Sequence, residues 1–153
     1  LDTATMEDAY KKMVNCAKAA ELATGAKLEF KEPRASLKAP IAVPSLTELM
    51  LAKMKAQGIT EQDIKNKDDF GSSDLGNVAH AYPTFNLTFK IAPDGTAGHS
   101  DAMREAAGSE EGWKATVTAG KIVALAAYEM LNNPVRVKEI QESFKVAKAK
   151  EGK

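Results

Sequence analysis

Two histidines occur in this chain, and each stands in a segment where an imidazole could bind a ligand. His99 lies between Gly98 and Ser100 in a small-residue loop that follows a predicted strand, and such loops commonly carry ligand-binding or catalytic groups. Its ring could bind a metal ion, or it could be a surface side chain without a role. His80 precedes the same strand in an apolar context, and we expect it to be half-buried and hydrogen-bonded to backbone. No zinc-ligand spacing links the two histidines.

Three acidic groups also resemble metal ligands. His99-Ser100-Asp101 has the form of a His-x-Asp pair, Glu110-Glu111 that of a base beside a ligand, and Asp68-Asp69 that of a hard-cation site. Structural roles are the simpler interpretation. Asp101 suits a helix N-cap, and the glutamates fall in a predicted first helical turn, where the helix dipole favours negative charge. Neighbouring helix residues diverge in direction, so the glutamate pair cannot aim both carboxylates at one ion.

The stretch "GSSD" at 71–74 forms a loop before a predicted helical turn. Free backbone N–H groups at such a helix start can hold a carboxylate or a phosphate. The stretch matches no established phosphate-binding motif, because it has neither Gly-x-x-x-x-Gly-Lys nor Gly-x-Gly-x-x-Gly.

Helical and alternating patterns predict the elements that position these residues. Helices are predicted over residues 4–24, from Ser45 to Gly58, over 109–131 and from Pro134 onwards, and strands over 26–31 and about 84–92. The proline-rich segment 32–44 separates the two strands, so we expect them in different sheets. Residues 122–128 are apolar on nearly every side, so the helix that contains them should be buried.

Composition narrows the function classes. The 21 basic and 21 acidic residues cancel, which argues against nucleic-acid and membrane-surface partners. The longest apolar run is far shorter than the roughly 20 residues that cross a bilayer. The single cysteine, Cys16, cannot form an intrachain disulfide, and its alanine-rich setting suggests a small buried hydrophobe. We therefore expect a cytoplasmic protein.

Taken together, the loops resemble the C-terminal part of the co-catalytic zinc amidohydrolases and dipeptidases of the aminoacylase/carboxypeptidase metallopeptidase superfamily. The similarity is to the branch of aminobenzoyl-glutamate hydrolases and Xaa-Arg dipeptidase-like enzymes, and it runs from about residue 5 to 148. The pattern Gly-Ser-[Ser/Thr]-Asp-x-Gly-[Asn/Asp]-Val-Ser is matched, except at its last place, where Ala79 stands, by Gly71, Ser72, Ser73, Asp74, Gly76, Asn77 and Val78. The pattern His-[Ser/Thr]…Glu-Ala-Ala-Gly-Ser is matched by His99, Ser100, Glu105, Ala106, Ala107, Gly108 and Ser109.

The resemblance assigns roles to these residues. It implies that His99 is a ligand in a two-zinc site, which could also take other divalent metals, and that His80 is not a ligand. It implies that the substrate is a small N-acyl amino acid or dipeptide whose amide bond is hydrolysed. Residues of the substrate pocket, offering backbone N–H groups to the substrate carboxylate, would be Gly71, Ser72, Ser73 and Asp74.

The same resemblance implies an α/β fold class, or α+β for this piece alone. Residues 1–32 would be the helix-strand end of a ferredoxin-like lid and dimerisation domain, 33–44 a connector, and 45–153 the C-terminal part of a zinc-peptidase-type α/β catalytic domain. The remaining zinc ligands and the catalytic glutamate would lie in a missing N-terminal part of the same enzyme, so this chain would hold no catalytic residue and be inactive alone. A homodimer through the lid is expected. The alternative is a non-catalytic binding or structural module.

Overall fold

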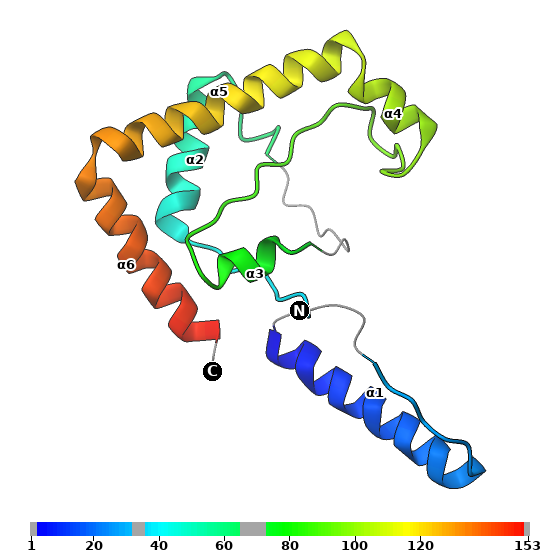
Figure 1. Ribbon diagram of the computed structural model, residues 1–153. Helices are drawn as coiled ribbons and strands as arrows, with labels where there is room; N and C mark the ends of the chain where they lie inside the picture. Colours follow the sequence, from blue (N-terminus) through cyan, green and yellow to red (C-terminus); the bar gives the residue numbers. More distant parts are fainter. Residues whose placement is uncertain (1–2, 32–35, 65–72, 152–153) are drawn as a thin grey trace.

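The computed structural model describes residues 3–31, 36–64 and 73–151. Within these ranges the chain forms six helices and no β-strand (Figure 1). The predicted α/β fold class, with a ferredoxin-like lid end and a zinc-peptidase-type α/β domain, is therefore wrong for this part of the chain. The helices are α1 (Thr3–Thr24), α2 (Pro44–Ala56), α3 (Leu75–Ala79), α4 (Asp101–Ala107), α5 (Glu110–Asn132) and α6 (Pro134–Glu151).

Both predicted strands lack the partner that a strand requires. Residues 26–31 and 83–91 have no regular secondary structure, and neither segment makes backbone hydrogen bonds to a neighbouring described segment. An isolated strand leaves its N–H and C=O groups unpaired, so alternation alone cannot stabilise it. The alternation at 84–91 still has an effect, because Phe85 and Leu87 pack against the core while Phe89 stays 46% exposed.

Helix boundaries follow the sequence signals more closely. Ser109 caps α5 by accepting a hydrogen bond from the Gly112 backbone N–H at 3.1 Å. Gly58, with φ at 82°, stands just past the end of α2, in a conformation that favours glycine. The predicted cap at Ser45 is wrong. That helix begins at Pro44, after Val43, without a side-chain cap.

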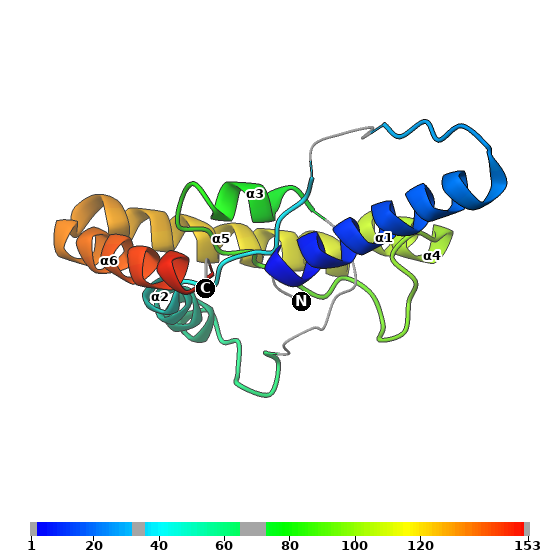
Figure 2. The ribbon, with the colours of Figure 1, turned by 90° about the horizontal axis from the view of Figure 1, so that it is seen from below.

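The core lies where α2 packs against α5 and α6 (Figures 1 and 2). Each of these helices turns an apolar stripe inward, as an amphipathic helix must. The buried cluster comprises Val43, Leu46, Leu49, Met50, Ile122, Ala126 and Ile140. Among the described residues, no helix is both long and apolar enough to cross a membrane.

Helix α3 fastens the segment 36–43, which belongs to the predicted connector. Asn77 accepts a hydrogen bond from the Lys38 backbone N–H at 3.0 Å and donates one to the Ser36 carbonyl at 2.9 Å. Gly76 lies so close that a Cβ built on it would stand 1.7 Å from the Lys38 carbonyl oxygen. This part of the connector is therefore bound to the helical body. The division of the chain at 33–44 stays a prediction.

Helix α1 stands apart from the core and has no buried residue. Its apolar side meets the following segment, where the rings of Tyr10 and Phe30 form an edge contact 5.9 Å between centroids. Cys16 is exposed, so the expectation of a buried thiol is wrong. The start of α1 is held near the end of α6, because the Thr3 hydroxyl donates to a Glu151 carboxylate oxygen at 3.2 Å.

Candidate functional site

His99 stands immediately before the N-cap of α4. The Ser100 hydroxyl accepts a hydrogen bond from the Met103 backbone N–H at 3.2 Å and donates one to the Ala97 carbonyl at 2.8 Å. These two bonds fix the backbone on both sides of His99. The His99 side chain is exposed and makes no hydrogen bond or ion pair with any described residue. An imidazole held this way is free to bind a group from outside the described part of the chain.

A tight corner joins α4 to α5 and sets the direction of this loop. A Cβ added to Gly112 would lie 2.4 Å from the Ala106 carbonyl oxygen, so the two helices can meet this closely only with glycine there. Ser109 donates to the same Ala106 carbonyl at 2.8 Å. The segment that matches His-[Ser/Thr]…Glu-Ala-Ala-Gly-Ser thus forms the capped helix α4 and the corner before α5, and His99 precedes the N-cap of α4.

The acidic groups near His99 serve the helix starts. Asp101 follows the cap instead of providing it, and it pairs with Arg104 at 3.3 Å in the first turn of α4. Glu110 pairs with Lys114 at 2.7 Å along α5. Both pairs are highly exposed and follow helical spacing. The expectation that Glu110 belongs to a first helical turn is confirmed, whereas Asp101 as an N-cap is wrong.

The second predicted loop lies partly outside the described residues, which include neither Gly71 and Ser72 nor the Asp68-Asp69 pair. Ser73 and Asp74 are exposed, and the Ser73 hydroxyl accepts a hydrogen bond from the Leu75 backbone N–H at 3.1 Å. Asp74 occupies the N-cap position of α3 without a side-chain cap.

Helices α3 and α4, which follow the two loops, lie apart in both ribbon views (Figures 1 and 2). A pocket shared by the two loops stays a prediction, as do the substrate-binding roles of Gly71, Ser72, Ser73 and Asp74.

His80 has a structural role. It is half-buried at the C-terminal end of α3, and its Nε2 lies 3.1 Å from the Ala39 carbonyl oxygen. Its own carbonyl accepts a hydrogen bond from Lys148 Nζ at 2.6 Å. The expectation of a half-buried histidine bonded to backbone is confirmed. This histidine ties α3, the segment 36–43 and α6 together.

The described residues do not make a complete metal site. Nowhere in residues 3–31, 36–64 and 73–151 do three His, Cys, Asp or Glu side chains gather closely enough to hold an ion. A stable zinc site needs three or four protein ligands. His99 therefore offers one imidazole, and any metal that it binds must take its other ligands from elsewhere.

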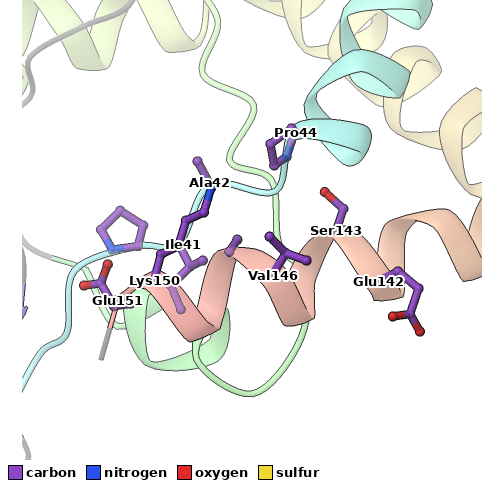
Figure 3. A pocket seen from close by; sticks show the side chains of 10 residues that line it. Ile41, Ala42, Pro44, Glu142, Ser143, Val146, Lys150 and Glu151 are labelled. Atoms are coloured by element: carbon purple, nitrogen blue, oxygen red, sulfur yellow. The ribbon is translucent and has the colours of Figure 1, made fainter. Parts of the chain in front are cut away.

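A hollow of about 470 Å³ lies between the segment 40–44 and α6 (Figure 3). Its walls are largely apolar, and its lining includes Ile41, Ala42, Pro44, Ser143, Val146 and Lys150. His99, Ser73 and Asp74 are not among the lining residues. Glu142 and Glu151 also line the hollow, and each already has a partner: Glu142 pairs with Lys145 at 2.6 Å, and Glu151 accepts a hydrogen bond from the Thr3 hydroxyl at 3.2 Å.

Sequence reasoning missed a charged cluster that joins three helices. Glu129 of α5 pairs with Lys53 of α2, and its other oxygen lies 3.5 Å from Nε of Arg136 in α6. The hydrogen bond from Lys53 lowers the pKa of Glu129 below its usual range. These side chains are 22–33% exposed, so the cluster borders the core. Their wide separation in sequence gave no local signal.

Comparison with known proteins gives one consistent relationship. No family model matches the chain. The human Xaa-Arg dipeptidase is 29% identical over 138 residues, covering 89% of this chain and 31% of that protein. The mouse Xaa-Arg dipeptidase is 28% identical over 138 residues, covering 88% of this chain and 32% of that protein. The chain thus spans about a third of the length of the curated relatives it matches, and it has a distant similarity to Xaa-Arg dipeptidases over most of its own length.

Proposed function

We propose that this chain is the C-terminal segment of a metal-dependent amidohydrolase or dipeptidase that hydrolyses amide bonds of small N-acyl amino acids or dipeptides. The observation that carries the proposal is the similarity to Xaa-Arg dipeptidases over nearly nine-tenths of the chain. Dipeptides that end in arginine are therefore the first substrates to test. The chain would supply His99 as one zinc ligand and the loop 71–74 as part of the substrate pocket.

The local structure around His99 is consistent with a ligand role. The ring is exposed, has no partner among the described residues, and follows a backbone that the Ser100 cap holds in place. A ligand needs one ring nitrogen that is free to bind the metal, while the other nitrogen is commonly hydrogen-bonded. Both ring nitrogens of His99 are without a described partner, whereas Nε2 of His80 is engaged with the Ala39 carbonyl.

Within this proposal the metal is zinc, with two ions in the full-length enzyme, or another divalent metal. A bound metal would polarise the substrate carbonyl and a water molecule. This chain would hold the His99 imidazole at the open end of the α4 loop and offer backbone N–H groups near Ser73 and Asp74 to the substrate carboxylate. The chain alone should be inactive, because one imidazole cannot hold a zinc ion by itself.

The test compares two histidine variants in the full-length protein that the gene encodes. His99→Ala should reduce hydrolysis of Xaa-Arg dipeptides and N-acyl amino acids by a factor of 100 or more, on the order of several kcal/mol of barrier, and lower the bound metal. The matched control, His80→Ala, should keep most of both. Initial rates and elemental analysis on the same samples give the two readouts.

Full activity in His99→Ala would exclude the proposed ligand. Equal loss of bound metal in both variants would mean that the choice of His99 over His80 as the metal ligand is wrong. A full-length protein that hydrolyses neither substrate class and binds no metal would favour the alternative, a non-catalytic binding or structural module.

A further inference from the structure

Helix α5 is apolar on two sides, one buried in the core and the other exposed to solvent. The inner side, with Ile122 and Ala126, belongs to the core. The other side, which we name the outer face of α5, is exposed throughout and contains no charged residue. It consists of Trp113, Val117, Gly120, Ala124, Tyr128 and Leu131. These residues recur at intervals of three and four, so they form one stripe along the helix.

The exposure of this face is large for apolar side chains. Trp113 is 65% exposed, Tyr128 68% and Leu131 84%. In Figure 1, α5 runs along the upper edge of the molecule, and the end of α2 crosses it. The expectation that residues 122–128 would be buried on every side is therefore wrong in this chain. A contiguous apolar stripe of this length is typical of a surface that another polypeptide covers.

Gly120 adds a second, independent observation. It lies in the middle of a helix, where glycine is less stable than alanine. A Cβ built on it would meet nothing within 4 Å, so packing inside the described chain does not require glycine at this position. Ala124, one turn later on the same face, is also small. Two small residues between Val117 and Tyr128 make a notch into which another backbone can approach closely.

The accessible surface of the chain is larger than that of a compact monomer of its mass. The chain has 11711 Å² of accessible surface. A compact monomer of 16.4 kDa exposes about 7500 Å². The excess, roughly 4000 Å², is spread over the chain and includes helix α1, which has no buried residue, whereas a standard interface buries about 800 Å² on each partner. One helix packed against its copy would cover only a small part of this excess.

We propose that the outer face of α5 packs against the N-terminal part of the same longer protein, which inserts an apolar element into the notch at Gly120 and Ala124. This inference rests on the proposed function, in which the chain is the C-terminal segment of a longer enzyme. The relatives support the choice of partner, because more than two-thirds of each lies outside the matched part. The interface then buries a surface that this chain cannot cover.

The first experiment measures access to the outer face with engineered cysteines. Val117→Cys places a thiol in the stripe, and Lys114→Cys places a control thiol about a quarter turn away on the charged edge of α5. Alkylation by iodoacetamide is followed by mass spectrometry of the α5 peptide, in chain 1–153 and in the full-length protein. Val117→Cys should react about tenfold or more slowly in the full-length protein, whereas Lys114→Cys should react equally in both.

Equal reaction of Val117→Cys in both proteins would overturn the proposal, and so would a gene that encodes these residues alone. Slow reaction in chain 1–153 that accelerates on dilution would assign the face to a second copy instead. The readout does not depend on activity. Protection of Val117→Cys in a full-length protein without hydrolase activity would therefore uphold the interface and reject the proposed function. An active protein in which Val117→Cys reacts freely would uphold the function and reject the interface.

A second pair of variants tests the notch. Gly120→Leu should leave the urea midpoint of chain 1–153 unchanged or raise it, because the space is open and leucine is a better helix former. In the full-length protein it should lower the midpoint, because the notch is filled. Lys121→Leu, the neighbouring exposed position, should have little effect in either. An unchanged midpoint for Gly120→Leu in the full-length protein would contradict a close approach at this position.

Discussion

The two histidines differ in what they contact, and this difference predicts effects of different size on stability. His80→Ala removes the contact of its ring with the Ala39 carbonyl and should lower the free energy of unfolding by about 1 kcal/mol. His99→Ala removes a side chain without a described partner and should change it by less than about 0.5 kcal/mol. Urea denaturation of chain 1–153 measures both. A destabilised His99→Ala would mean that the ring has a structural role.

Glu129 makes stability depend on acidity. Its ion pairs with Lys53 and Arg136 lower its pKa in the folded chain, so the pairs contribute fully above the unfolded pKa of about 4.3. This contribution is lost as the pH falls through the lowered pKa. Glu129→Gln should therefore be less stable than the parent chain at neutral pH, and the difference should shrink as the solution is acidified below about 4.3. Urea midpoints of both chains across this range test the sign, and a difference independent of pH would contradict it.

The close packing of α3 against the segment 36–43 requires glycine at position 76. Gly76→Ala would place a Cβ 1.7 Å from the Lys38 carbonyl oxygen, so helix and segment must separate. The cost should be roughly 1–3 kcal/mol, and proteases should cut the segment 36–43 faster. Gly98→Ala is the matched control, because its Cβ would meet nothing within 4 Å. Equal stability of the two variants would mean that this approach is not tight.

The helices could be predicted from the sequence because their signals are local. Ser109 before an apolar run and Pro134 after Asn133 are caps and starts whose hydrogen bonds form within a few residues. The strands could not be judged in this way. The alternation at 84–91 states which side is apolar, whereas a strand also needs a partner that the described residues do not supply.

The candidate site could be predicted only in part, for a related reason. The loop before α4 and the role of His80 follow from neighbouring residues. A metal site joins side chains distant in sequence, and the described part of this chain brings no such set to His99. The cluster of Glu129, Lys53 and Arg136 was missed because it joins three helices. Long-range geometry, which no local pattern specifies, decides both cases.

Across the described chain, burial is uneven: the core lies among α2, α5 and α6, whereas α1 is exposed. No residue of α1 is buried, whereas Leu49 of α2 is 3% exposed in the core. A chain that begins at Ser36 should therefore lose the helical signal of α1 and yet unfold cooperatively. Its free energy of unfolding should fall by no more than about 1 kcal/mol, because α1 has no buried residue and Thr3 contacts Glu151 and Ala39 through half-buried hydrogen bonds.

The comparison for this shortened chain is Leu49→Ala, which opens a cavity among α2, α5 and α6. That substitution should cost about 2–5 kcal/mol in the full chain and in the shortened one alike, because α1 does not reach the core. Urea denaturation followed by circular dichroism gives all four values. If removing α1 destabilised the chain as much as Leu49→Ala does, α1 would be part of the cooperative unit. If Leu49→Ala costs the same in both chains, so that the two changes are additive, residues 36–151 are the folding unit that contains the loop of His99.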